Sequence, residues 1–183
     1  MRRPPAVPWL LGLCVLSACG SGGPVGGGAR PGEYIGSSVA IECAPFARAL
    51  TGVRLTGAAD DWWGQAAGRY RRAASPEVGA ILVLRRSDGL PEGHVAIVTG
   101  VLSSRQVLVT QANWVHHRIT EDQPVIDVSA RNDWSMVRVW WPPADQMGIT
   151  EYPARGFILP GRPASHDELI AATPRAIRLA ASE

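Results

Sequence analysis

The chain has 183 residues, of which 46% are hydrophobic and 19% are charged, so it can bury one sizeable core and carry accessory segments. Its formal net charge is only +2, and Arg2 and Arg3 account for that excess in a segment that we expect to be removed. A mature protein this close to neutral lacks the bulk positive charge that attracts polyanions, so we expect no nucleic-acid partner.

The N-terminus has the pattern of an export signal. Two arginines precede an apolar run at residues 6–16, and small residues follow it. The run is too short for a helix that spans a bilayer, which needs about 20 residues. Residues 16–19 resemble a bacterial lipobox, which implies that residues 1–18 are a lipoprotein-type signal peptide and that Cys19 is lipidated. The alternative is a plain secretory signal that is cut nearby.

A lipid on Cys19 would tether the protein to a membrane of the cell envelope, on its periplasmic face. Gly20 stands where an Asp would act as a retention signal, so analogy with lipoproteins of two-membrane bacteria favours the outer membrane over the inner one. Residues 19–34 are Gly-rich and almost lack apolar side chains. They predict a flexible linker between the lipid and the folded domain.

The three cysteines have different expected fates. Cys14 is lost with the signal and Cys19 carries the lipid, which leaves Cys43 as the only free thiol of the exported protein. A disulfide framework is therefore excluded. A single thiol left over in an oxidising compartment is a candidate reactive group.

Residues 35–142 have the pattern of one compact domain. Helical spacing predicts two helices, at residues 43–50 and 59–73. Runs of β-branched and aromatic residues then predict about five short strands, at 78–84, 93–99, 106–112, 125–128 and 135–141. This order predicts an α+β fold with N-terminal helices packed on a small antiparallel β-sheet. Residues 143–183 predict a Pro-rich C-terminal extension, irregular up to Pro163, with either a short helix or disorder after it.

Cys43 is the first candidate catalytic residue. We expect it in the first turn of a helix, where unpaired backbone N–H groups and the helix dipole favour the thiolate, which is the nucleophilic form. On position alone, a buried cysteine that acts as a small apolar residue is an equally good interpretation. His94, at the start of a predicted strand, would by itself be read as a strand-end histidine.

A predicted hairpin gives His94 a polar neighbour. If strands 94–99 and 106–113 are symmetric about Ser103 and Ser104, His94 lies opposite Asn113, and directly opposed Cβ atoms are about 4.5–5.5 Å apart. Gln111 falls on the same face because side chains repeat every two residues. A one-residue bulge near Gly100 would break this register. A cysteine, a histidine and a polar group that orients it are the parts of a nucleophilic triad.

Five sequence blocks resemble a CHAP domain, a cysteine- and histidine-dependent amidohydrolase/peptidase related to NlpC-type and papain-like enzymes. The blocks are ECAPFAR (42–48), GA followed by WW (57–63), GHVAIV (93–98), QANW (111–114) and DWS (133–135). The resemblance covers roughly residues 35–142. It implies a papain-like or NlpC-like fold, with Cys43 as nucleophile, His94 as base and Asn113 at a polar position of the active site.

The resemblance implies that peptidoglycan is the substrate. The bond cut would be the amide between muramic acid and its stem peptide, as in an N-acetylmuramoyl-L-alanine amidase, or a bond within the wall peptides. Many relatives place a carboxylate two residues before Asn113, where this sequence has Gln111, which can orient an imidazole but cannot stabilise its charge. Whether Gln111 or Asn113 orients His94 stays open. The departure also motivates an alternative function, a catalytically weak CHAP-like binding or scaffold lipoprotein.

His116 and His117 resemble a metal-ligand pair only superficially. No cluster of Cys, Asp or Glu in the sequence completes a site around them, so solvated loop histidines are the better interpretation. We expect neither a metal nor a cofactor.

Overall fold

The computed structural model describes Met1, Tyr34–Ile35, Ser38 and residues 40–183. The predicted signal peptide, Cys19 and nearly all of the predicted linker lie outside the described residues. Within the described part, the helices are α1 (Cys43–Thr51), α2 (Trp62–Gln65) and α3 (His166–Ala180), with 3-10 turns at Ala59–Asp61 and Pro142–Ala144. None of these helices is long and apolar enough to cross a membrane.

The described strands form one antiparallel sheet that closes on itself. They are β1 (Tyr34–Ile35), β2 (Arg71–Ala73), β3 (Ile81–Leu84), β4 (His94–Ser103), β5 (Gln106–Ala112), β6 (Ile119–Asp127), β7 (Met136–Trp141), β8 (Gln146–Met147) and β9 (Tyr152–Leu159). The pairing order β6-β5-β4-β3-β9-β7 returns to its start because β7 also pairs with β6, so these strands make a six-stranded barrel. The predicted α+β class is confirmed, and the expected small sheet is a closed barrel.

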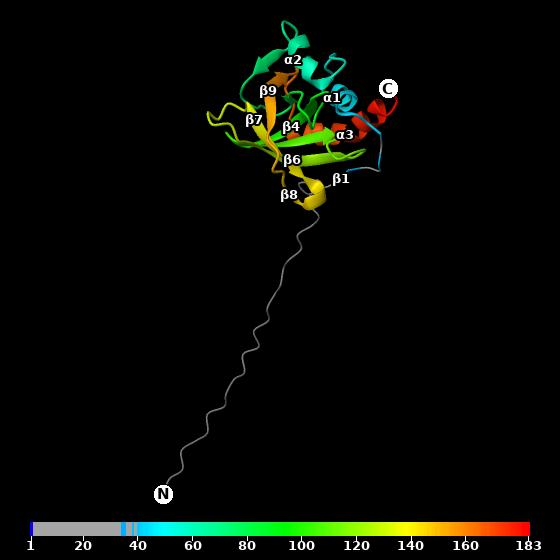
Figure 1. The fold of residues 1–183 in the computed structure, drawn as a ribbon. Coiled ribbons are helices and arrows are strands. Elements are labelled where there is room, and N and C mark those ends of the chain that lie inside the picture. The colour runs from blue at the N-terminus through cyan, green and yellow to red at the C-terminus, as the bar shows by residue number, and fades with distance from the viewer. Residues whose placement is uncertain (2–33, 36–37, 39) are drawn as a thin grey trace.

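Strand β3 shows how the sequence builds two hydrophobic layers. All four of its residues are buried, as expected for a strand covered on both faces. Ile81 and Val83 belong to the cluster that packs under α1 and α3, whereas Leu82 and Leu84 join the cluster that fills the barrel. The helices therefore cover one outer face of the barrel, as Figure 1 shows for α1 and α3.

The second predicted helix is much shorter in the structure. The helical region at residues 59–73 contains only a 3-10 turn and α2, and the chain then turns at Gly68, whose φ is +72°. Its last three residues form β2, which pairs with β9. The tertiary pairing overrides a helical spacing that is only local.

Residues 143–183 add strands β8 and β9 and helix α3 to the folded unit. Strand β9 lies between β3 and β7 and completes the barrel. Its Gly156 has φ +120°, and a Cβ there would lie 2.6 Å from the Ala73 carbonyl oxygen, so the position requires glycine. The sequence reading gave no strand here because Pro and Gly surround this segment.

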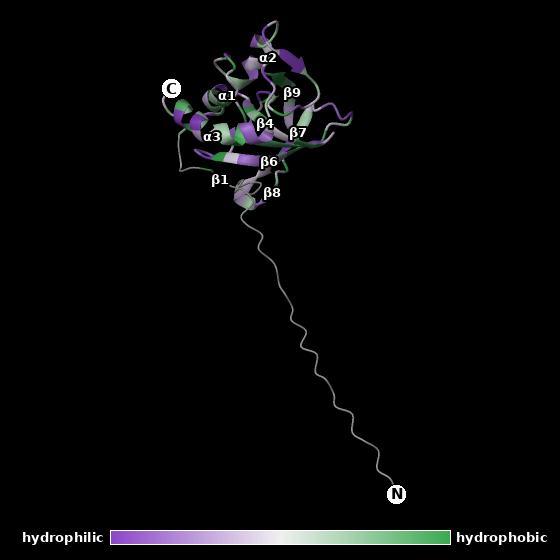
Figure 2. Ribbon diagram, turned by 180° about the vertical axis from the view of Figure 1, so that it is seen from behind, coloured by the Kyte–Doolittle hydropathy of each residue, from purple (hydrophilic) through white to green (hydrophobic). Residues whose placement is uncertain are grey.

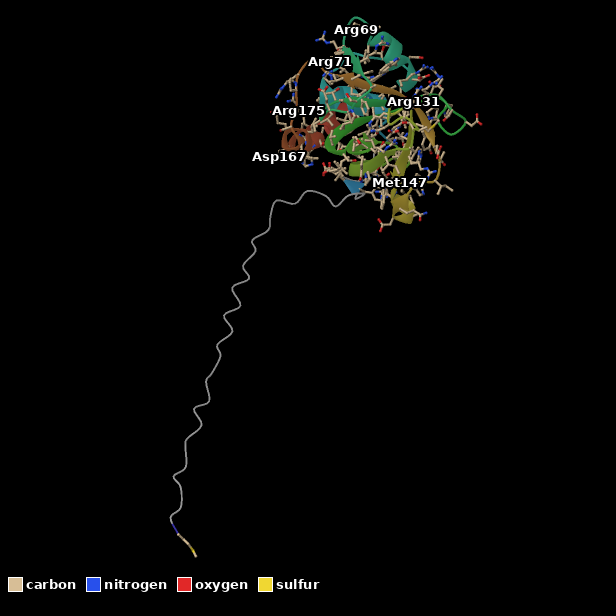
Figure 3. All side chains as sticks on the ribbon, turned by 90° about the vertical axis from the view of Figure 1, so that its left-hand side faces the viewer. Arg69, Arg71, Arg131, Met147, Asp167 and Arg175 are labelled. Atoms are coloured by element: carbon tan, nitrogen blue, oxygen red, sulfur yellow. The ribbon has the colours of Figure 1, made fainter. Side chains whose placement is uncertain are left out.

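Helix α3 is continuous through Pro174 and lies against α1. A capping box starts it, because the Ser165 side chain accepts from the Glu168 N–H and the Glu168 side chain accepts from the Ser165 N–H. Its inner face contributes Leu169, Ala176 and Ala180 to the core under α1. The helix is amphipathic, with hydrophilic and hydrophobic residues in Figure 2, and Figure 3 shows Asp167 and Arg175 at its outer face.

Candidate active site

Helix α1 places Cys43 at its first position. Glu42 precedes it as the N-cap in an extended conformation, and Gly52 ends the helix in the left-handed region. Phe46 and Ala47 are completely buried and fix the helix on the barrel. Because Cys43 is the first residue of α1, its sulfur lies near the unpaired N–H groups of the helix N-terminus, which favour a thiolate. Its side chain is only partly buried.

His94 is the first residue of β4 and is 4% exposed. The tight turn before it depends on Gly93, whose φ is +74°. A Cβ at Gly93 would lie 2.6 Å from the Leu84 carbonyl oxygen and 2.8 Å from the Asp60 nitrogen. The close approach of β3 and the Asp60 backbone therefore fixes the point at which β4 begins, and with it the position of the imidazole.

Cys43 and His94 shift each other's pKa in opposite directions. Burial raises the pKa of the Cys43 thiol, but the charge of His94, its hydrogen bond and a hydrogen bond from the Val95 N–H lower that pKa below its ordinary value. Burial lowers the pKa of His94, and the charge and hydrogen bond of Cys43, with the hydrogen bond to Gln111, raise it above its ordinary value. These are the shifts of a thiolate–imidazolium pair.

Gln111 is the residue that contacts the other side of the imidazole. Its Oε1 lies 2.9 Å from His94 Nε2, and Gln111 is 1% exposed. A carbonyl oxygen accepts a proton but cannot donate one, so this contact places a hydrogen on Nε2 and leaves Nδ1 for Cys43. The sequence leaves open whether Gln111 or Asn113 orients His94. In the structure, the side chain that contacts the imidazole is that of Gln111.

A buried polar chain holds Gln111 in turn. Gln111 Nε2 donates to Gln123 Oε1 at 2.7 Å, and the Thr120 hydroxyl donates to the same oxygen at 2.7 Å. Gln123 and Thr120 are completely buried in β6. No local sequence pattern marks these two residues, because a bulge in β6 sets their position.

Asn113 lies beside the cleft but has different partners. Strands β4 and β5 have the expected pairing register at Ile97, which lies opposite Thr110. Two register shifts interrupt the pairing between this point and the hairpin turn. Strand β5 ends at Ala112, and Asn113 turns into the left-handed region with φ 59°. Its Nδ2 donates to Glu42 Oε2 at 2.8 Å, and its Oδ1 accepts from the His117 N–H at 2.8 Å.

The Asn113–Glu42 hydrogen bond ties the end of β5 to the start of α1. Glu42 is exposed. Its charge nevertheless raises the pKa of both Cys43 and His94. Glu42 is therefore part of the electrostatics of the pair as well as a structural link.

Trp114 supports the imidazole from the side. Its ring meets the His94 ring edge-on, with centroids 5.1 Å apart and an interplanar angle of 62°. Its Nε1 donates to the Trp140 carbonyl oxygen at 3.1 Å, and its far edge meets Tyr152 at 5.1 Å. Tyr152 and the Trp140 carbonyl hold the Trp114 ring in place, and the Trp114 ring limits the rotation of His94.

The pair opens into a cleft of about 650 Å³. Its walls are the start of α1, residues 57–59 and the loop 89–93, and its charged lining residues are Glu42, Arg48 and Glu92. Among the described residues, no cluster of three side chains could hold a metal ion. The cleft is lined by the Cys43 thiol and the His94 imidazole.

Comparison with known proteins finds one matching family model. The family model of the CHAP domain matches residues 33–113, a range that contains Cys43, His94, Gln111 and Asn113. This part of the chain is therefore similar to CHAP domains. No curated protein matches the chain.

Among solved structures, the crystal structure of Ly7917 with the hydrolyzing product of MDP is similar, at 17% identity and a TM-score of 0.37. The similarity covers 69% of this chain and 58% of that one, so the chain spans less than two thirds of that protein's length.

Proposed function

We propose that the protein is a peptidoglycan amide-bond hydrolase with Cys43 as nucleophile, His94 as acid and base, and Gln111 as the residue that orients His94. The observation that carries the proposal is the Cys43–His94 pair, whose pKa shifts favour the thiolate and the imidazolium together at the wall of an open cleft. Asn113 has a positioning role in this proposal, because it links the turn after β5 to Glu42.

The first half of the reaction forms a thioester. The Cys43 thiolate attacks the carbonyl carbon of the amide, a C–S bond forms, and the carbonyl electron pair moves to oxygen. The Cys43 backbone N–H at the helix N-terminus is our candidate donor to that oxyanion. His94 gives its proton to the amide nitrogen, the C–N bond breaks, and the amine leaves.

The second half uses water. His94, now neutral, takes a proton from water while the water oxygen attacks the thioester carbon. The C–O bond forms, the C–S bond breaks, and the thiolate and imidazolium are restored with a free carboxylic acid as product. The neutral Gln111 holds the ring throughout but adds no charge to stabilise the imidazolium.

The deciding experiment is digestion of purified peptidoglycan followed by mass spectrometry of the fragments. We expect new amine and carboxyl ends in equal number, and no release by Cys43→Ala. The masses also separate cleavage at the muramic acid amide from cleavage within the wall peptides. Equal release by Cys43→Ala would overturn the proposal.

A binding or scaffold function is the second candidate, and Gln111 in place of a carboxylate is the observation that favours it. Alkylation of Cys43 by iodoacetamide across pH separates the two functions. A thiol of ordinary pKa together with intact peptidoglycan after incubation would favour the scaffold.

We also propose that Cys19 carries a lipid that anchors the domain at the periplasmic face of the outer membrane. The lipobox-like residues 16–19 and the Gly-rich segment after them support it. Cell fractionation tests the anchor: Cys19→Ser should move the protein from the membrane to the soluble fraction. Retention of Cys19→Ser in the membrane would contradict lipidation.

A further inference from the structure

A second pocket lies at the same end of the barrel as the catalytic cleft. Because neighbouring strands are antiparallel, the end of β3, the start of β4, the end of β5 and the start of β9 meet there. The end of β7 pairs with β8, and residues of both line the pocket. The pocket has a volume of about 320 Å³. The residues that line it include Trp114, Trp141, Gln146, Ile149, Thr150 and Tyr152.

The pocket and the cleft share a wall. Trp114 lines the pocket, and its ring contacts the ring of His94 in the cleft. Gly89 lines the cleft, and a Cβ there would lie 4.0 Å from a ring carbon of Tyr152, which lines the pocket. The pocket and the catalytic cleft therefore lie on the two sides of Trp114 and Tyr152.

Trp141 is unusually exposed for its place in the strand. Val137 and Val139 are buried on the inner face of β7, and the period of two puts Trp141 on that same face. Trp141 nevertheless is 41% exposed, and Ile149 across the pocket is 84% exposed. Large apolar side chains left together in water mark a binding surface more often than an accident of folding.

The lining of the pocket differs chemically from that of the cleft. None of the described residues that line the pocket is charged, whereas Glu42, Arg48 and Glu92 line the cleft. The pocket combines aromatic rings with an amide and hydroxyl groups, which suit an uncharged ring that carries hydroxyl and amide substituents. The ionised ends of a peptide suit the charged cleft instead.

We propose that the pocket binds an N-acetylated amino-sugar ring of the glycan strand, with Trp141 as its main aromatic contact. The inference about which bond is cut rests on the proposed hydrolase function. With the sugar in the pocket and the peptide in the cleft, Cys43 faces the amide that joins them. The geometry thus favours an amidase over a peptidase that cuts within the wall peptides.

Isothermal titration calorimetry tests the sugar site without needing activity. The mature full-length protein with Cys43→Ala is titrated with an N-acetylglucosamine tetrasaccharide, and the same titration is done after adding Trp141→Ala. We expect saturable binding that weakens about tenfold without the Trp141 ring. Leu102→Ala is the matched control, because Leu102 is an apolar residue, 57% exposed, at the opposite end of β4. It should bind like the parent.

Thermal unfolding should show that all three proteins fold alike. Absence of saccharide binding by the parent, or equal binding after Trp141→Ala, overturns the sugar site. Displacement of the saccharide by a sugar-free wall tetrapeptide would put the peptide in the pocket and also overturns it. Saccharide binding that depends on Trp141 in a protein that leaves peptidoglycan intact would instead support the sugar site and refute only the hydrolase.

Discussion

The side chain that holds His94 is neutral. When the Cys43 thiolate is consumed in forming the C–S bond, the imidazolium loses its partner charge, and Gln111 cannot replace it. The Gln111 carbonyl fixes the ring but contributes no charge. In the proposed mechanism, the imidazolium is therefore left without a partner charge until it transfers its proton.

Gln111→Glu should raise kcat/KM on peptidoglycan, on the order of tenfold, since one pKa unit on His94 corresponds to about 1.4 kcal/mol. The buried carboxylate needs a donor, and Gln123 Nε2 has no hydrogen-bond partner among the described residues, so rotation of its amide can supply one. Gln111→Leu is the matched control. It removes the acceptor and should lower kcat/KM on the order of a hundredfold. Equal activity of the parent and both variants would contradict a role for Gln111.

The pH dependence of kcat/KM should be bell-shaped. The lowered pKa of Cys43 sets the acid limb, because below it the thiol is protonated, and the raised pKa of His94 sets the alkaline limb, because above it the acid is lost. With ordinary pKa values for both groups, no pH would favour thiolate and imidazolium together. The measurement is the initial rate at low substrate concentration across pH. A single rising limb would contradict the ion pair.

The same shifts give the sign of the stability change. The pKa of Cys43 is lower in the folded protein than in the unfolded chain. Cys43 therefore stabilises the fold at pH values above its unfolded-state pKa, and this stabilisation is lost as the pH falls through its folded-state pKa. The pKa of His94 is higher in the folded protein than in the unfolded chain. His94 therefore stabilises the fold at pH values below its unfolded-state pKa, and this stabilisation is lost as the pH rises through its folded-state pKa. The pair therefore stabilises the fold within the pH range in which it is also active.

The site residues differ in how far the sequence could predict them. The positions of Cys43 at a helix start and His94 at a strand start follow from local pattern, and the structure has them there. The sequence could not separate Gln111 from Asn113, because both lie on one face by the period of two. The left-handed conformation of Asn113, which turns it away from the strand, is set by the loop after it.

At the scale of elements, the turn between β3 and β4 sets the catalytic geometry. Gly93→Ala should destabilise the protein by about 1–3 kcal/mol, because φ is +74° and the added Cβ would collide with Leu84 and Asp60. It should also reduce activity by displacing His94. Denaturant unfolding measures the first effect and peptidoglycan digestion the second.

Gly64→Ala is the control for this substitution. Gly64 lies in α2, has no positive φ, and a Cβ there would meet nothing within 4 Å. Alanine at that position should be neutral or slightly stabilising, because it is the better helix former. Equal unfolding free energies for the two variants would show that the turn is not strained by a side chain.

Elements with a strong local signal were the ones that the sequence predicted. Helix α1 and strand β5 lie within a residue of their predicted bounds, and β4 begins one residue late and continues past its predicted end. Strand β9 escaped prediction because its Gly156 and the Pro and Gly around it are required by contacts with distant strands. Strand β9 forms because it pairs with β2 and β3, and a local sequence pattern contains no information about that pairing.

At the scale of the whole molecule, the barrel needs residues from beyond the predicted domain boundary. A fragment of residues 35–142 lacks β9 and α3, which leaves the edges of β3 and β7 unpaired and uncovers the core under α1. We expect this fragment to be insoluble or unfolded by circular dichroism, whereas residues 35–183 fold. A fragment of residues 35–142 that unfolds cooperatively and digests peptidoglycan would refute this.

The lowered pKa of the Cys43 thiol also has a redox consequence. A thiolate is the form that peroxides oxidise to a sulfenic acid, and many redox-sensitive proteins then trap that product as a disulfide with a second thiol. Cys43 is the only free cysteine of the part of the chain that the structure describes. Among the described residues it therefore has no partner thiol once it is oxidised, and we expect its recovery to depend on an external reductant.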